Sequence, residues 1–145
     1  MTQLDSSITA PFLASTAVGD AMRAGVIECE PEADVTEIAR LMSDHGIHCV
    51  VVAGIERREH GGDRLAWGIV SDLDLIRALA PGAPPTSAGR LAAGEIVTVE
   101  PTDSLEHAVQ LMAEHDTHHL VVASSRSGRA LGVLSTLDIA RAIGG

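Results

Sequence analysis

Two segments of this chain have closely similar sequences, and this duplication constrains the fold more than any other feature. Residues 18–53 align with residues 88–123 at an offset of 70. The identical pairs include Gly19/Gly89, Glu30/Glu100, Pro31/Pro101, Met42/Met112, His45/His115 and His48/His118. After a loop of different length, Gly68–Asp74 aligns with Gly132–Asp138. A repeated supersecondary unit buries its apolar face against its copy, so we expect two related sites, or one site where the copies meet.

The composition excludes several classes of function. The chain has 145 residues, a formal net charge of −10 and no lysine. Because polynucleotides and anionic membranes attract positively charged surfaces, neither is an expected partner. Phe12 and Trp67 are the only aromatic residues, which also argues against the stacking platforms that bind single strands. A single nucleotide is still compatible, because backbone amides and one or two Arg or His side chains can hold its phosphate.

The expected location is the cytoplasm. The sequence has no apolar run of 18 residues, and Asp5 stands where a secretory signal would carry basic residues. Cys29 and Cys49 lie in apolar segments without Cys-x-x-Cys spacing, which predicts two small buried side chains in a reducing compartment.

The pattern of apolar residues predicts an α/β (α+β) fold with two β-α-β-β-α units. We expect a loose N-terminal arm at 1–16, a first repeat at 17–80, a Pro- and Gly-rich linker at 81–87 and a second repeat at 88–145. In the first repeat, Asp34 and Glu37 predict a capped helix that ends at Gly46, followed by a strand at 49–53. A polar loop at 57–63, a strand at 66–70 and a helix from Ser71 complete the unit. The second repeat has the same order.

The motif Gly-h-h-Ser-x-x-Asp, where h is apolar, occurs at Gly68–Asp74 and at Gly132–Asp138. Ser-x-x-Asp at the start of a helix is an N-terminal capping pattern, in which each side chain satisfies backbone donors. A functional interpretation is also possible, because a helix N-terminus attracts anions and a carboxylate accepts ribose hydroxyls. The two interpretations are compatible.

In this order and in duplicate, these segments resemble cystathionine β-synthase (CBS) domains, in the tandem arrangement called a Bateman module. The resemblance covers about residues 17–143. It rests on Val18–Met22, on Ile27–Pro31 with Ile96–Pro101, on Leu41–His48 with Leu111–Leu120, and on the two Gly-h-h-Ser-x-x-Asp segments. It implies a stand-alone CBS-domain protein whose two repeats pack with pseudo-twofold symmetry.

The resemblance also implies clefts that bind adenosyl ligands such as AMP, ADP, ATP or S-adenosylmethionine. The family pattern assigns ribose-binding positions to Ser71, Asp74, Ser135 and Asp138. It assigns phosphate-contacting positions to His48 and His118, and the base pocket to Ile27 and Val97, with Gly25 just before it. One site can take its first-strand residues from one repeat and its Ser-x-x-Asp from the other.

Two departures from the family pattern affect these expectations. Val51 and Val121 stand where relatives commonly have proline in the second strand. Asp72 in the first motif corresponds to Thr136 in the second. Because the Asp72 neighbourhood should repel phosphate more, we expect unequal sites, with the one at Ser135 and Asp138 more readily occupied than the one at Ser71 and Asp74.

The histidines raise a metal hypothesis that the sequence leaves open. His115, His118 and His119 have helical i, i+3, i+4 spacing, whereas zinc needs three or four converging ligands. We expect the helix to end near His115, so that this spacing does not persist, and we assign no metal ligands.

The sequence favours a regulatory module over an enzyme, because it contains no nucleophile elbow, phosphate-binding Gly-Lys loop or His-Glu-x-x-His motif. We expect an adenosyl ligand, a homodimer formed by the apolar helices after Ser71 and Ser135, and an unidentified effector protein. The alternative is a scaffold that binds no ligand and serves in protein interaction or dimerisation.

Overall fold

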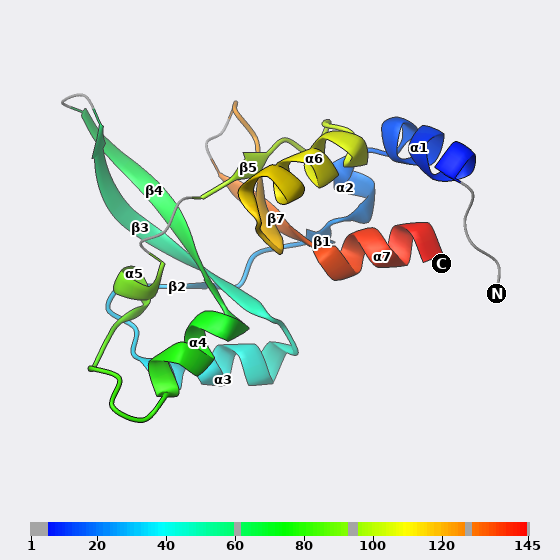
Figure 1. Ribbon diagram of the computed structural model, residues 1–145. Coiled ribbons are helices and arrows are strands. Elements are labelled where there is room, and N and C mark those ends of the chain that lie inside the picture. Colours follow the sequence, from blue (N-terminus) through cyan, green and yellow to red (C-terminus); the bar gives the residue numbers. More distant parts are fainter. Residues whose placement is uncertain (1–5, 60–61, 93–95, 127–128, 145) are drawn as a thin grey trace. The chain divides into compact units, whose positions relative to one another are not determined.

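The computed structural model describes residues 6–59, 62–92, 96–126 and 129–144, and it confirms the predicted mixed α/β fold (Figure 1). The helices are α1 (Ser6–Ser15), α2 (Val18–Ala21), α3 (Val35–His45), α4 (Asp72–Leu79), α5 (Ala88–Leu91), α6 (Leu105–His115) and α7 (Thr136–Gly144). The strands are β1 (Arg23–Ala24), β2 (Glu28–Cys29), β3 (Cys49–Glu59), β4 (Gly62–Ser71), β5 (Thr98–Val99), β6 (His119–Ala123) and β7 (Ala130–Ser135).

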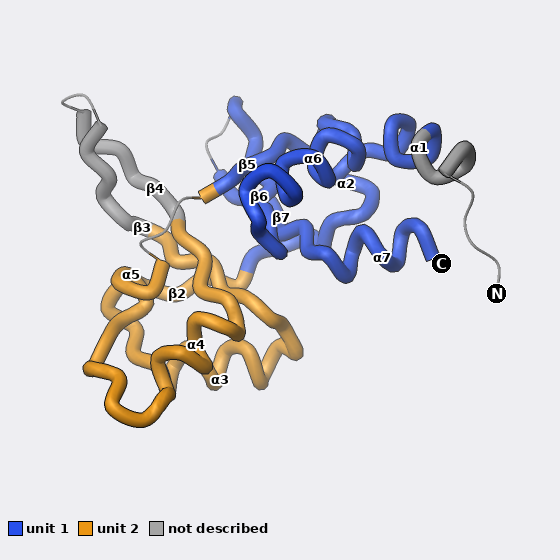
Figure 2. The backbone as a smooth tube through the Cα atoms, in the orientation of Figure 1, with its two compact units in different colours: residues 1–26, 97–145 blue, residues 27–96 orange. Residues whose placement is uncertain are grey.

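The chain forms two compact units, which are coloured separately in Figure 2. Unit 1 combines Met1–Val26 with Val97–Gly145, and unit 2 is Ile27–Ile96. Each unit therefore contains most of one sequence repeat, together with a short segment from the beginning of the other.

Unit 1 contains a sheet with the strand order β1-β7-β6-β5. β5 runs parallel to β6, whereas β7 is antiparallel to both β6 and β1. Helix α6 and strands β6 and β7 bury apolar side chains in one core, and partly buried residues of α7 pack against it. The fully buried members include Leu105, Ala108, Leu120, Val122 and Leu134.

Unit 2 contains a sheet with the strand order β2-β3-β4. β2 is parallel to β3, and β3 is antiparallel to β4. Its core includes Ile38 and Met42 of α3, Val50 and Val52 of β3, and Val70 of β4. Helix α3 begins at the predicted cap, where Asp34 accepts a hydrogen bond from the Glu37 amide, and ends at Gly46 in the left-handed region.

The segments that begin the two sequence repeats are exchanged between the units. Val18 and Gly19 donate backbone hydrogen bonds to Asp103 and Pro101 within unit 1. At the equivalent positions, Ala88 and Gly89 donate to Ala33 and Pro31 within unit 2. Val18 and Ala88 are both fully buried, so each segment completes a core made mainly of the other repeat.

The predicted polar loop at 57–63 is wrong. β3 continues to Glu59 and β4 begins at Gly62, with Glu59 paired to Gly62 across the hairpin. Antiparallel pairing satisfies the backbone donors and acceptors along both strands, so the ladder can continue through a polar sequence. Residues 60–61 lie outside the described part of the chain.

The predicted loose arm at 1–16 also differs from the structure, because residues 6–15 form α1. Leu13 packs against the unit 1 core, and Leu105 donates a backbone hydrogen bond to Thr16 at the end of the helix. The sequence shows little helical periodicity there, so tertiary packing stabilises this helix. Within the described residues, no helix combines the length and apolar character needed to cross a membrane.

Candidate functional site

The two Ser-x-x-Asp motifs cap α4 and α7 with nearly the same geometry. Asp74 Oδ2 accepts hydrogen bonds from the Ser71 amide and from Ser71 Oγ, both at 2.9 Å. Asp138 Oδ2 accepts the equivalent bonds from Ser135 at 2.8 and 3.0 Å. The capping interpretation is therefore confirmed at both helices. Because a single oxygen of each carboxylate makes these bonds, Oδ1 can still accept a hydrogen bond from a ligand.

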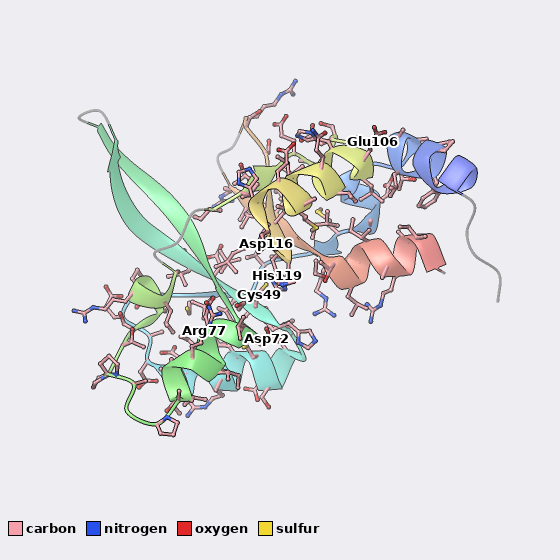
Figure 3. The ribbon with its side chains drawn as sticks, in the orientation of Figure 1. Cys49, Asp72, Arg77, Glu106, Asp116 and His119 are labelled. Atoms are coloured by element: carbon pink, nitrogen blue, oxygen red, sulfur yellow. The ribbon has the colours of Figure 1, made fainter. Side chains whose placement is uncertain are left out.

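His48 and His118 lie beside these two helix N-termini. The carbonyl of His48 accepts a hydrogen bond from the Asp72 amide at 2.8 Å, and that of His118 accepts one from Thr136 at 3.1 Å. The side chains differ, because His48 Nδ1 lies 3.2 Å from Asp72 Oδ2 whereas Thr136 has no carboxylate. Figure 3 labels Asp72 on α4. The negative charge of Asp72 thus distinguishes the first helix N-terminus from the second.

Gly25 directly follows β1, the strand through which the beginning of the first repeat pairs with the end of the second. Arg23 and Ala24 of β1 pair with Val133 and Gly132 of β7, and the Gly25 amide donates to Leu131. A Cβ atom at Gly132 would overlap the Arg23 carbonyl oxygen, so this close approach requires glycine.

Ile27 and Val97 occupy equivalent positions in unit 2 and unit 1. Val51 donates a backbone hydrogen bond to the Ile27 carbonyl at 3.0 Å, and Val121 donates to Val97 at 3.2 Å. Proline has no amide hydrogen and could not make these bonds. The two valines that depart from the family pattern therefore hold the segments preceding β2 and β5 to their sheets.

Unit 1 contains a groove of about 510 Å³ where α1, α2, β1 and α7 meet. This volume lies within the usual range for small-molecule sites, which is roughly 300–1,000 Å³. The side chains that give the groove its chemical character are those of Phe12, Thr16, Asp20, Arg23, Asp138 and Arg141. They combine one aromatic ring with two carboxylates and two guanidinium groups.

Of the predicted site residues, Asp138 lines this groove. Ser135, His118, Gly25 and Val97 also belong to unit 1, whereas Ser71, Asp74, His48 and Ile27 belong to unit 2.

Phe12, Asp20, Arg23 and Arg141 line the groove but were not predicted as site residues from the sequence. The sequence contained a pattern that could have identified Arg141. It follows Asp138 by one helical turn, and Arg77 follows Asp74 at the same spacing in the first repeat.

Burial affects the chemistry of Cys29, which belongs to the unit 2 core. Desolvation, with a smaller contribution from the charge of Glu37, raises the pKa of the Cys29 thiol to about 11. A thiol with so high a pKa is a poor nucleophile and metal ligand at neutral pH, which agrees with the predicted structural role.

The three histidines of the metal hypothesis do not share one helix. Helix α6 ends at His115, Asp116 caps it in the left-handed region, and His119 begins β6. Figure 3 labels Asp116 and His119 at this connection. Across residues 6–59, 62–92, 96–126 and 129–144, no group of three or more His, Cys, Asp or Glu side chains is arranged to hold a metal ion.

The family model for the CBS domain matches the chain twice, at residues 18–81 and at residues 88–145. The chain belongs to the CBS-domain family. Hypoxic response protein 1 of Mycobacterium tuberculosis is 31% identical over 129 residues, which cover 87% of this chain and 84% of that protein. A crystal structure of Hypoxic Response Protein I with two coordinated zinc ions aligns with a TM-score of 0.66 and 30% identity, covering 87% of this chain and 98% of that one.

Two other solved CBS structures have the same fold at lower sequence identity. The CBS domain pair of protein MJ0100, in complex with 5′-methylthioadenosine and S-adenosyl-L-methionine, has a TM-score of 0.74 and 23% identity, covering 90% of this chain and 97% of that chain. The CBS domain of a bacterial CNNM/CorC family Mg²⁺ transporter, in complex with ATP, has a TM-score of 0.73 and 16% identity, covering 96% and 94%. CBS domains of this fold thus bind adenosine-containing ligands in other proteins.

Proposed function

We propose that this CBS-domain protein is a regulatory module that binds an adenosyl ligand, of the AMP, ADP, ATP or S-adenosylmethionine class, and signals its presence to a partner. The observation that carries the proposal is the position of Asp138. Its Oδ2 atom caps α7, and the same side chain lines a groove of ligand size. The adenosyl ligands of the two solved CBS structures support the choice of ligand class.

Two polar groups of the groove, Asp138 and Arg141, have assigned roles in this proposal. Asp138 Oδ1 accepts hydrogen bonds from ribose hydroxyls, because an ionised carboxylate is acceptor-only and binds paired donors well. Arg141, one helical turn further along α7, provides a positive charge for a phosphate or carboxylate. Ser135 holds the Asp138 carboxylate in position through its amide and hydroxyl.

The two motifs are proposed to bind ligand with unequal affinity. In unit 2 the Asp72 carboxylate lies beside His48, where the family pattern expects a phosphate. A second negative charge there disfavours an anionic ligand by Coulomb repulsion. The site of Ser135 and Asp138 is therefore the one that fills first.

Signalling follows from differential binding. The groove is formed by the segment at the beginning of the first repeat and by α7 of the second, so an occupant holds these elements together. A ligand shifts a conformational equilibrium by its difference in affinity for the two states. We propose that the effector protein, or a second copy of the chain, recognises the state with ligand bound.

A thermal-shift panel separates this proposal from the alternative of a scaffold without ligand. The panel contains AMP, ADP, ATP, S-adenosylmethionine, NADH and cyclic dinucleotides, each at millimolar concentration, with zinc in a separate arm because of the mycobacterial relative. A ligand at 100 times its Kd adds about 2.7 kcal/mol to the free energy of unfolding, which raises Tm by several degrees. Stabilisation by an adenosyl compound is expected. No response to any nucleotide would favour the scaffold.

A further inference from the structure

Helix α1 lies before the first CBS repeat, yet it contributes part of the groove in unit 1. The family model begins to match at residue 18, whereas Phe12 and Thr16 line the groove. Two contacts near the C-terminal end of α1 hold the helix in place. Leu13 packs against the unit 1 core, and the Thr16 carbonyl accepts a hydrogen bond from the Leu105 amide at 2.9 Å.

This attachment directs Phe12 toward the groove. Adjacent residues of a helix point about 100° apart, so packing of the partly buried Leu13 against the core places Phe12 on a different face of the helix. Phe12 is 37% exposed, so part of its surface is in contact with water, and the residue lines the groove. Phe12 is one of only two aromatic residues in the chain, and an exposed position is unusual for such a side chain.

The charged groups of the groove can hold the rest of a nucleotide. Asp138 and Asp20 provide acceptors, and Arg141 and Arg23 provide donors. Among the residues that the structure describes, neither arginine forms an ion pair, so both can bind an external anion. An aromatic ring, a carboxylate and a guanidinium group in one groove match the base, the ribose and the phosphate of a nucleotide.

We propose that α1 forms one wall of the ligand site, that Phe12 stacks on the purine base of an adenine nucleotide, and that Arg141 contacts its phosphate. This inference rests on the proposed function, because it assigns residues to the same site. It adds an element outside the CBS repeats to the binding machinery, and it selects phosphate-bearing adenine nucleotides over uncharged adenosine compounds.

The test is isothermal titration of the full chain with adenosine and with AMP. Phe12→Ala is expected to weaken the affinity for both ligands about tenfold, because it removes a base contact that they share. Arg141→Gln is expected to weaken AMP binding by a similar factor and to leave adenosine binding unchanged. Phe12→Tyr keeps the aromatic face and is expected to bind both ligands as the wild type does.

Leu131→Ala is the matched control, because Leu131 is also 37% exposed and belongs to the same unit. It should bind both ligands with wild-type affinity. If Phe12→Ala keeps wild-type affinity while its melting temperature is unchanged, the assignment of α1 is overturned and the proposed function stands. If wild-type protein binds neither adenosine nor AMP, the inference fails; if it also shows no stabilisation by any adenosyl compound of the thermal-shift panel, the proposed function fails with it.

Discussion

We propose separate roles for the two carboxylate oxygens of Asp138. Oδ2 accepts two hydrogen bonds from Ser135 and thereby caps α7, which leaves Oδ1 for the groove. Asp74 caps α4 through equivalent bonds to Ser71. Asp74 therefore serves as a reference within the same chain. The stability lost on replacing Asp74 estimates the capping contribution of Asp138, so an effect of Asp138 on ligand binding can be measured separately.

A stability prediction concerns Asp116, which caps α6 with a φ of 49°. Gly46 caps α3 at the equivalent position with a φ of 60°. Because a side chain is strained in this region, Asp116→Gly should add roughly 0.5–1 kcal/mol to the free energy of unfolding. Differential scanning calorimetry should show a Tm higher by about 2–4 °C. The reverse substitution, Gly46→Asp, should lower Tm, and a lower Tm for Asp116→Gly would contradict this account of the cap.

At this scale the sequence predicted the helix caps but only part of the groove. Ser71, Ser135 and Gly46 have local signatures, because capping depends on residues within one turn. The groove position of Phe12 depends on which face of α1 packs against the core, and that contact joins residues distant in sequence. Asp20 and Arg23 line the groove because β1 pairs with β7, which is a contact between segments distant in sequence.

At the scale of elements, the two compact units differ from the two sequence repeats. The offset of 70 showed which residues are equivalent, and the equivalent hydrogen bonds of Val18 and Ala88 agree with it. It could not show that the segment at the beginning of each repeat packs on the core of the other repeat. Aligning a chain with itself shows which residues are equivalent, but not which segments are in contact. The strands and helices between these segments were largely predictable from their apolar periodicity.

The exchange of the leading segments predicts a penalty for adding a methyl group to Gly19 or Gly89, which occupy equivalent positions in the two repeats. A Cβ atom at Gly89 would lie 3.0 Å from Pro31 Cβ and 3.2 Å from its carbonyl oxygen. At Gly19 the corresponding distances to Pro101 are 3.4 and 3.2 Å. Gly89→Ala should therefore lower the free energy of unfolding by about 1–3 kcal/mol, as overpacking does.

Urea unfolding of Gly89→Ala and Gly19→Ala measures this effect, and the larger loss is expected for Gly89→Ala. Gly25→Ala is a useful comparison, because nothing lies within 4 Å of its Cβ position and its φ of 85° alone causes strain. Wild-type stability in both Gly89→Ala and Gly19→Ala would show that the leading segments do not pack as described.

At the scale of the whole molecule, α4 carries large apolar side chains that face water in a single chain. Leu73, Ile76 and Leu79 are 49%, 62% and 59% exposed, and Leu137 at the equivalent position of α7 is 46% exposed. Large apolar side chains that are exposed along one helix, such as the three of α4, indicate an interaction site. This pattern supports the homodimer proposed from the sequence, with a second copy covering these helices.

Ile76→Glu tests that interface. Placing a charge in an apolar contact requires its desolvation, so the variant should weaken self-association at least tenfold and leave the fold intact. Light scattering after size-exclusion chromatography should show a dimer for the wild type and a monomer for the variant. Thr36→Glu changes an exposed residue of α3 and serves as the control. A wild-type protein that is monomeric at high concentration would contradict the interface.

The central claim is that Asp138 binds an adenosyl ligand in addition to capping α7. Isothermal titration of AMP into Asp138→Ala, beside Asp74→Ala, tests it most directly. Both variants should lose a similar amount of stability, about 1 kcal/mol, because each loses the same capping bonds. Asp138→Ala should also weaken AMP binding at least tenfold, whereas Asp74→Ala should leave the tighter binding event unchanged. Equal AMP affinity in the wild type and in Asp138→Ala would show that Asp138 is a helix cap without a role in ligand binding.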